Sequence, residues 1–164
     1  MDSQSDKQTI TITLMMTRLM LPEDVPAISH WMADMPLWKR YGVTEASASA
    51  QFSDALKRGD LLLVASGTVA NCGFAWCARG AAFGRSDYLR LIGVRSDCAG
   101  QGVGAALLSE VEAQTQTRDL FLLVSDFNEG AQRFYRRMGY EQIGAIPGYV
   151  LPDVAELIFR KRLH

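Results

Sequence analysis

Residues 91–108 read LIGVRSDCAGQGVGAALL, an apolar strand-like run followed by a glycine-rich turn and a helical pattern. Gly100, Gly102 and Gly104 let the backbone approach a ligand closely. Free amides at the start of the following helix carry partial positive charge, which suits a phosphate or pyrophosphate. The stretch therefore predicts an anion-binding turn between a strand and a helix, although the glycines alone fit a tight turn without a ligand equally well.

Two common phosphate-binding motifs fit this stretch poorly. A P-loop needs a lysine followed by serine or threonine after the last glycine, and residues 105–107 are Ala-Ala-Leu. A dinucleotide fingerprint has the spacing Gly-x-Gly-x-x-Gly, whereas this turn has Gly-x-Gly-x-Gly. A P-loop and a dinucleotide-binding turn are therefore both disfavoured.

The hydrophobic pattern on both sides of this turn predicts a mixed α/β or α+β fold. Residues 88–95 and 120–124 form strands on either side of the helix that begins at Gly102, so they make a parallel βαβ pair. The remaining strands are mostly antiparallel, which gives a sheet of about seven strands with about four helices. The other expected strands are 10–20, 61–66, 71–79, 140–145 and 154–162, and the other helices are 24–32, 48–56 and 129–138.

Composition limits the classes of function. The 164 residues suit one domain, expected over 9–164 behind a flexible polar tail at 1–8. A net charge of -1 gives no basic field for nucleic acid or a membrane surface, and no apolar run is long enough to span a bilayer. The three cysteines and two histidines lack metal-ligand spacing, so we expect no metal and a reduced, cytoplasmic setting.

Two motifs together resemble those of the GNAT superfamily of acetyl-CoA-dependent N-acetyltransferases. In the first family motif, a valine is followed at fixed intervals by Gln or Arg, Gly, and Gly or Ala. Val94, Gly102 and Gly104 match it, while Ala99 stands at the Gln or Arg position. The second family motif reads Asn-x-x-Ala-x-x-Phe-Tyr-x-x-x-Gly-Phe or Tyr. It is matched by Asn128, Ala131, Phe134, Tyr135, Gly139 and Tyr140.

The resemblance implies acetyl-CoA as co-substrate, bound in a gap between two splayed parallel strands. The implied cofactor-binding residues are Ile92, Gly93, Val94, Ala99, Gly100, Gln101, Gly102, Val103, Gly104, Ala105, Asn128 and Tyr135. It also implies that Tyr135 protonates the departing thiolate and that the Val94 N–H stabilises the oxyanion. The structural alternatives are a helix N-cap for Asn128 and an aromatic core position for Tyr135.

The residue that deprotonates the acceptor amine is not evident. Many family members carry an acidic residue four positions before the conserved valine, and here that position is Arg90, which cannot act as a base. Asp87, Asp126 and Glu23 are alternatives. Arg90 itself either binds an acidic substrate group or pairs with a neighbouring carboxylate.

The expected reaction is attack by a primary amine of a small molecule or peptide on the thioester through a tetrahedral intermediate. An aromatic wall from Trp31, Trp38, Tyr41 and Tyr149 could hold the acceptor, or these residues could serve packing alone. The alternative function is an acyl-CoA sensor or scaffold without turnover. Acceptor identity, acyl-chain length and a homodimer are left open.

Overall fold

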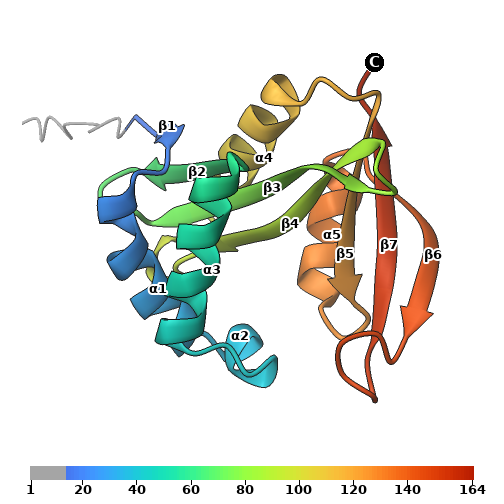
Figure 1. Cartoon of the computed structure of the whole chain (residues 1–164), viewed down its shortest axis with the longest axis horizontal. Coiled ribbons are helices and arrows are strands. Elements are labelled where there is room, and N and C mark those ends of the chain that lie inside the picture. Colours follow the sequence, from blue (N-terminus) through green and yellow to red (C-terminus); the bar gives the residue numbers. More distant parts are fainter. Residues whose placement is uncertain (1–13) are drawn as a thin grey trace, which may run out of the picture.

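A computed structural model describes residues 14–164 as helices packed on both faces of one mixed sheet (Figure 1). The strand order is β1-β2-β3-β4-β5-β7-β6, and only β4 and β5 run parallel. The expected tail and the first residues of the expected strand 10–20 lie outside the described residues. The seven strands are β1 (Met16–Leu19), β2 (Leu61–Ser66), β3 (Gly73–Ala82), β4 (Ser86–Val94), β5 (Asp119–Ser125), β6 (Glu141–Pro147) and β7 (Ala155–Arg162).

Residues 14–164 contain five α-helices, one more than the sequence pattern predicts. The additional helix, α2, lies between the expected helices 24–32 and 48–56, and its five residues are too few to produce a periodic pattern. Helices α1 and α3 cover one face of the sheet, and α4 and α5 cover the other. The helices are α1 (Val25–Asp34), α2 (Pro36–Arg40), α3 (Glu45–Arg58), α4 (Val103–Gln114) and α5 (Glu129–Arg137).

Helix α3 is longer at both ends than its predicted core, 48–56, because its termini are capped. Thr44 accepts a hydrogen bond from the Ser47 amide, and Ser47 Oγ accepts one from the Thr44 amide. Gly59 follows the helix with a φ of +78°, the left-handed conformation typical of a helix end. The resulting helix buries Phe52 against Phe74 and Trp76.

The feature that positions the site is the separation of β4 from β5. The parallel pairing covers only three residue pairs and ends at Leu89 opposite Leu122. At this point Trp76 pairs with Leu91 and Cys77 with Leu89, so Arg90 is the extra residue of a β-bulge, which bends a strand. Figure 1 shows β4 turning away from β5 toward α1 and α3. The predicted splayed βαβ pair is therefore confirmed.

The expected strands 61–66 and 71–79 are β2 and β3, and their antiparallel pairing is confirmed, with Leu61 opposite Cys77 and Ala65 opposite Gly73. The three cysteines are buried free thiols. Within residues 14–164, no helix has the length and apolar character needed to cross a bilayer.

Candidate functional site

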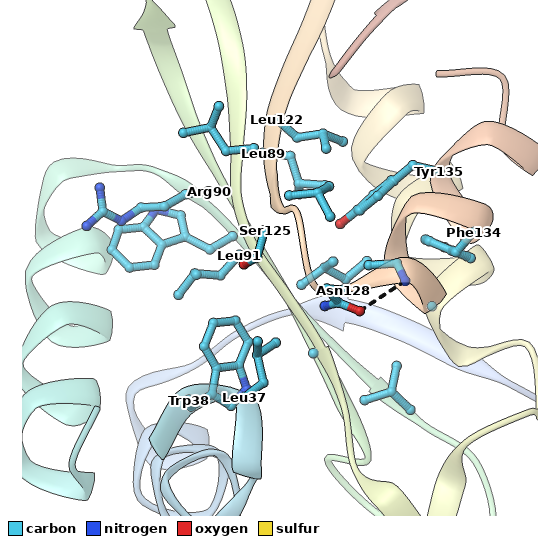
Figure 2. Close-up of a pocket in the computed structure, with 18 of the residues that line it drawn as sticks. Leu37, Trp38, Leu89, Arg90, Leu91, Leu122, Ser125, Asn128, Phe134 and Tyr135 are labelled. Atoms are coloured by element: carbon cyan, nitrogen blue, oxygen red, sulfur yellow. Dashed lines mark hydrogen bonds between the residues drawn. The ribbon is translucent and has the colours of Figure 1, made fainter. Parts of the chain in front are cut away.

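A cavity of about 1780 Å³ opens where β4 and β5 separate. It is bordered by β4 on one side, by the carboxyl end of β5 on the other, and by the starts of α4 and α5 (Figure 2). Leu37, Trp38 and Tyr41, from α2 and the residue after it, close it on the opposite face of the sheet. The two predicted motifs therefore meet at one space.

Two backbone amides of β4 face this gap. Arg95 donates to the Cys72 carbonyl at 2.8 Å, and Gly73 lies opposite Val94 in the same antiparallel ladder. Alternate residues of such a ladder direct their N–H and C=O groups away from the partner strand. Val94 and Ile92 are therefore the residues that point their amides away from β3, toward the side where β5 has diverged.

The start of α4 supplies further donors. Gly102 is the N-cap residue with a φ of +80°, and no side chain caps the helix. The amides of Val103, Gly104 and Ala105 have no acceptor within the helix, because the first intrahelical acceptor, the Gly102 carbonyl, is used by Ala106. A Cβ built on Gly100 or Gly102 would meet no atom within 4 Å. The turn thus leaves open space beside unpaired amides.

All of the predicted cofactor-binding residues of the turn except Gln101 border the cavity. Ala99, Gly100, Gly102, Val103, Gly104 and Ala105 border the cavity. Gln101 does not border it, and its side chain donates to the Asp97 carbonyl at 3.5 Å.

Gly93 is constrained by packing. A Cβ at this position would lie 2.6 Å from Cε1 of Phe74, a buried ring wedged between helices and sheet. We expect Gly93→Ala to lower the free energy of unfolding by about 1–3 kcal/mol, the usual cost of overpacking a core. Chemical denaturation measures this. Gly144→Ala is the control, since its Cβ would meet Ile158 at 3.5 Å, an ordinary contact. Equal stability changes in the two variants would contradict the packing argument.

Asn128 is placed to serve both as a helix N-cap and as a contact for a ligand in the cavity. Its Oδ1 accepts the Ala131 amide at 3.1 Å, so it is the N-cap of α5. Its side-chain NH2 has no partner within residues 14–164, and the residue borders the cavity. The amide group can therefore cap the helix and still donate to a ligand.

Tyr135 lies on α5 with its ring buried among Phe134, Tyr140 and Phe159. Its hydroxyl points into the gap between β4 and β5 (Figure 2), and no hydrogen bond to it is found within the described part of the chain. Burial, and secondarily the nearby Tyr88, raise the pKa of Tyr135 above its usual value. The phenol therefore stays protonated and can act as a proton donor.

Arg90 points away from Tyr135, across the other side of β4 (Figure 2). Its guanidinium lies over the Trp76 ring, 4.8 Å from the centroid. No carboxylate of residues 14–164 pairs with it, so of the two roles suggested for Arg90 the ion pair is not found, and a cation–π contact takes its place. The β-bulge explains this orientation, because the extra residue redirects its side chain.

The three carboxylates suggested as bases do not border the cavity. Asp87 is buried and accepts from Arg79 at 2.8 Å and from the Gly80 amide at 2.9 Å. Asp126 accepts from the Ala155 amide, and Glu23 belongs to a 3-10 turn before α1. The contacts of Asp87 and Asp126 are structural.

Sequence reasoning missed a different carboxylate, Glu156 of β7, which does border the cavity. Tyr41 Oη donates to Glu156 Oε1 at 2.5 Å and lies 2.5 Å from Ser125 Oγ. Of the proposed aromatic wall, Trp38, Tyr41 and Tyr149 border the cavity. Trp31 does not, and its indole N–H donates to the Asn71 carbonyl.

Comparison with solved structures identifies the same fold in other proteins. An N-acetyltransferase from Staphylococcus aureus Mu50 is 17% identical, with a TM-score of 0.79 over 92% of this chain and 99% of that one. The protein yncA of Salmonella typhimurium, solved with its cofactor acetyl-CoA, is 15% identical. Its TM-score is 0.73 over 92% of this chain and 94% of that one.

Sequence comparison gives a curated relative and a family. The 5-NmdU N-acetyltransferase of Pseudomonas phage PaMx11 is 35% identical over 69 residues, 42% of this chain. The match spans about half, 49%, of the length of that relative. The family model described as the acetyltransferase (GNAT) domain matches residues 58–142, just over half of the chain. The match includes β4, the glycine turn and α5, so the chain belongs to the GNAT acetyltransferase family.

Proposed function

We propose that the chain is an acetyl-CoA-dependent N-acetyltransferase whose acceptor is a primary amine of a small molecule or peptide. The gap between β4 and β5 carries the proposal, because the free amides of β4, the start of α4 and the Tyr135 hydroxyl all face it. The name of the phage relative specifies N-acetylation, which favours nitrogen as the acceptor atom.

The residues present fit the coenzyme. The unpaired amides at Val103, Gly104 and Ala105 would receive the pyrophosphate, since the start of a helix favours anions. The open space at Gly100 and Gly102 allows the phosphates to reach the backbone. Ile92 and Val94 would pair with the pantetheine amides in the manner of an added strand, with Asn128 as a further donor.

The chemistry needs an oxyanion stabiliser and a proton donor. The Val94 N–H would hydrogen-bond the thioester oxygen as it becomes negative during amine attack. Tyr135 would donate its proton to the departing sulfur, a role that its raised pKa suits. Cys98 also borders the cavity, but burial raises the pKa of its thiol to about 11. Thiolate is therefore scarce there, which favours direct attack over an acyl-cysteine intermediate.

Release of coenzyme A thiol from acetyl-CoA on addition of a panel of primary amines tests the proposal. We expect release to require both the amine and the protein, and acetyl-CoA to bind in calorimetry without any amine. If acetyl-CoA binds and no amine or peptide causes release, the chain is an acyl-CoA-binding sensor or scaffold instead. Absence of acetyl-CoA binding would overturn the cofactor assignment as well.

A further inference from the structure

The cluster of Tyr41, Ser125 and Glu156 has no role in the steps above. Glu156 lies directly opposite Ser125, the last residue of β5, in the β5–β7 ladder. Its side chain is buried, with 6% of the residue exposed. Oε1 accepts the Tyr41 hydroxyl, and Oε2 has no partner within residues 14–164. One oxygen of a buried carboxylate is thus left available at the cavity wall.

The cluster and Tyr135 approach the gap from opposite faces of the sheet. Leu122 and Val124 of β5 pack in the same core as Tyr135. Side chains alternate along a strand, so Ser125 belongs to the other face, and Glu156 shares it because directly opposed residues do. An amine held at Glu156 would therefore meet the thioester carbonyl from the side away from Tyr135.

The negative charge of the Glu156 carboxylate is not balanced by a paired cation within residues 14–164. No lysine or arginine within the described part of the chain pairs with it, and the Tyr41 hydroxyl, itself bonded to Ser125 Oγ, is the one side-chain donor found there. Arg40, the nearest cation in sequence to Tyr41, is paired with Asp153 at 3.6 Å and lies over the Phe127 ring. Burying a carboxylate without a cation is costly, so the site is suited to a ligand that brings the positive charge.

The other titratable groups that face this carboxylate cannot replace it as a base. Burial and the Glu156 hydrogen bond raise the pKa of Tyr41 to about 12, and burial raises that of Tyr88 on β4 to about 12. Both phenols therefore remain protonated near neutral pH. Tyr149 faces the cavity from the loop after β6, and Asp126, next to Ser125, is committed to the Ala155 amide.

We propose that Glu156 binds the ammonium group of the acceptor and accepts its proton, and that the acceptor is a primary ammonium compound with an apolar or aromatic body. The inference rests on the proposed function. Trp38, Tyr41 and Tyr149 border the same cavity, Tyr41 in contact with Glu156, and aromatic faces attract both cations and apolar groups. Glu156 would thus act as the base in a chain that has Arg90 where many family members have an acidic residue.

The proton balance closes without any further reactant. The ammonium loses one proton to Glu156, which passes it to solvent, and the neutral nitrogen forms its bond to the thioester carbon. As the C–N bond forms, the nitrogen loses a second proton, which restores the one that Tyr135 gives to sulfur when the C–S bond breaks. The third proton stays on the amide nitrogen. The net products are the acetamide, coenzyme A thiol and one proton.

The test is Glu156→Gln, which keeps an oxygen to accept the Tyr41 hydrogen bond but cannot take a proton. We expect kcat/KM for the acceptor to fall about 10²-fold at pH 7, the lower end of a general base's contribution, with the KM for acetyl-CoA unchanged. The pH profile separates this role from a structural one. The variant's rate should rise tenfold per pH unit up to the ammonium pKa near 10, because only neutral amine then reacts.

The controls use the same sheet. Glu141→Gln, at the exposed start of β6, should leave both rate and pH profile unchanged. Glu156→Asp should recover part of the activity and the wild-type pH profile, and thermal unfolding checks that every variant is folded. A Glu156→Gln variant with the wild-type rate and profile overturns the proposal, while lack of coenzyme A release by the wild type counts against the proposed function instead.

A binding measurement tests the same proposal without turnover. Benzylamine should bind the wild type at least about tenfold tighter than benzyl alcohol, because only the former supplies a cation to Glu156. Glu156→Gln should remove that preference. Equal binding of the two probes to the wild type, or no binding of benzylamine, overturns the proposal.

Discussion

Replacing Gly102 with valine is expected to weaken acetyl-CoA binding by at least about 100-fold. Gly102 has a φ of +80°, a conformation that a β-branched residue adopts only with strain. The valine side chain would also occupy the open space beside the amides of α4. Losing two charge-assisted hydrogen bonds at about 1.5–3 kcal/mol each corresponds to about 10²- to 10⁴-fold in Kd.

Calorimetric titration with acetyl-CoA measures this loss, and Gly59→Val is its matched control. Gly59 ends α3 with a φ of +78°, and its Cβ would likewise meet no atom within 4 Å. It does not border the cavity. Both variants should therefore lose similar stability, and only Gly102→Val should lose binding. A folded Gly102→Val protein with unchanged Kd would remove the turn from the coenzyme site.

Local patterns predicted the strand, turn and helix that border one side of the cavity. The apolar run before Val94, the glycines after it and the helical spacing from Val103 onward lie within 20 residues of each other, so each constrains its neighbours. Asn128 and Tyr135 were predicted from the resemblance of the second motif to that of the GNAT superfamily. Their places at the cavity follow once β4 and β5 are recognised as parallel strands joined by α4.

The cluster of Tyr41, Ser125 and Glu156 could not be predicted, because long-range register creates it. Glu156 is 115 residues from Tyr41 along the chain, and it meets Ser125 only through the pairing of β5 with β7. Nothing in the local sequence separates this glutamate from the other acidic residues. Arg90 illustrates the reverse case: its linear position matches that of the family's acidic residue, but a β-bulge turns it onto Trp76.

Replacing Tyr135 with phenylalanine should lower kcat about 10²- to 10³-fold, within the range for loss of a general acid, and leave acetyl-CoA binding intact. The hydroxyl makes no hydrogen bond within residues 14–164, while the ring packs against Phe134, Tyr140 and Phe159. Phenylalanine preserves those contacts. The free energy of unfolding should therefore change by less than about 1 kcal/mol, a shift typical of substitutions that leave packing unchanged.

The direction of the pH dependence follows from the same burial. The pKa of Tyr135 is raised above the ordinary value of 10. The donor form, on which the proposed general-acid role depends, is thus present at all lower pH values and is lost only above that raised pKa. Tyr135 should produce no fall in rate below about pH 10, the ordinary pKa of tyrosine. A fall in the wild-type rate between pH 7 and 9 that Tyr135→Phe abolishes would contradict this assignment.

Tyr140→Phe is the matched control, because it removes a hydroxyl from the same aromatic cluster. Tyr140 lies 5.7 Å from Tyr135 between ring centroids, and its hydroxyl donates to Glu112 of α4 at 3.0 Å. It does not border the cavity. Losing this hydrogen bond to a carboxylate should cost about 1.5–3 kcal/mol of stability and leave kcat unchanged. Tyr135→Phe should therefore lower kcat and leave stability nearly unchanged, whereas Tyr140→Phe should lower stability and leave kcat unchanged. Measuring kcat and the free energy of unfolding for both variants distinguishes a general-acid role for Tyr135 from a packing role.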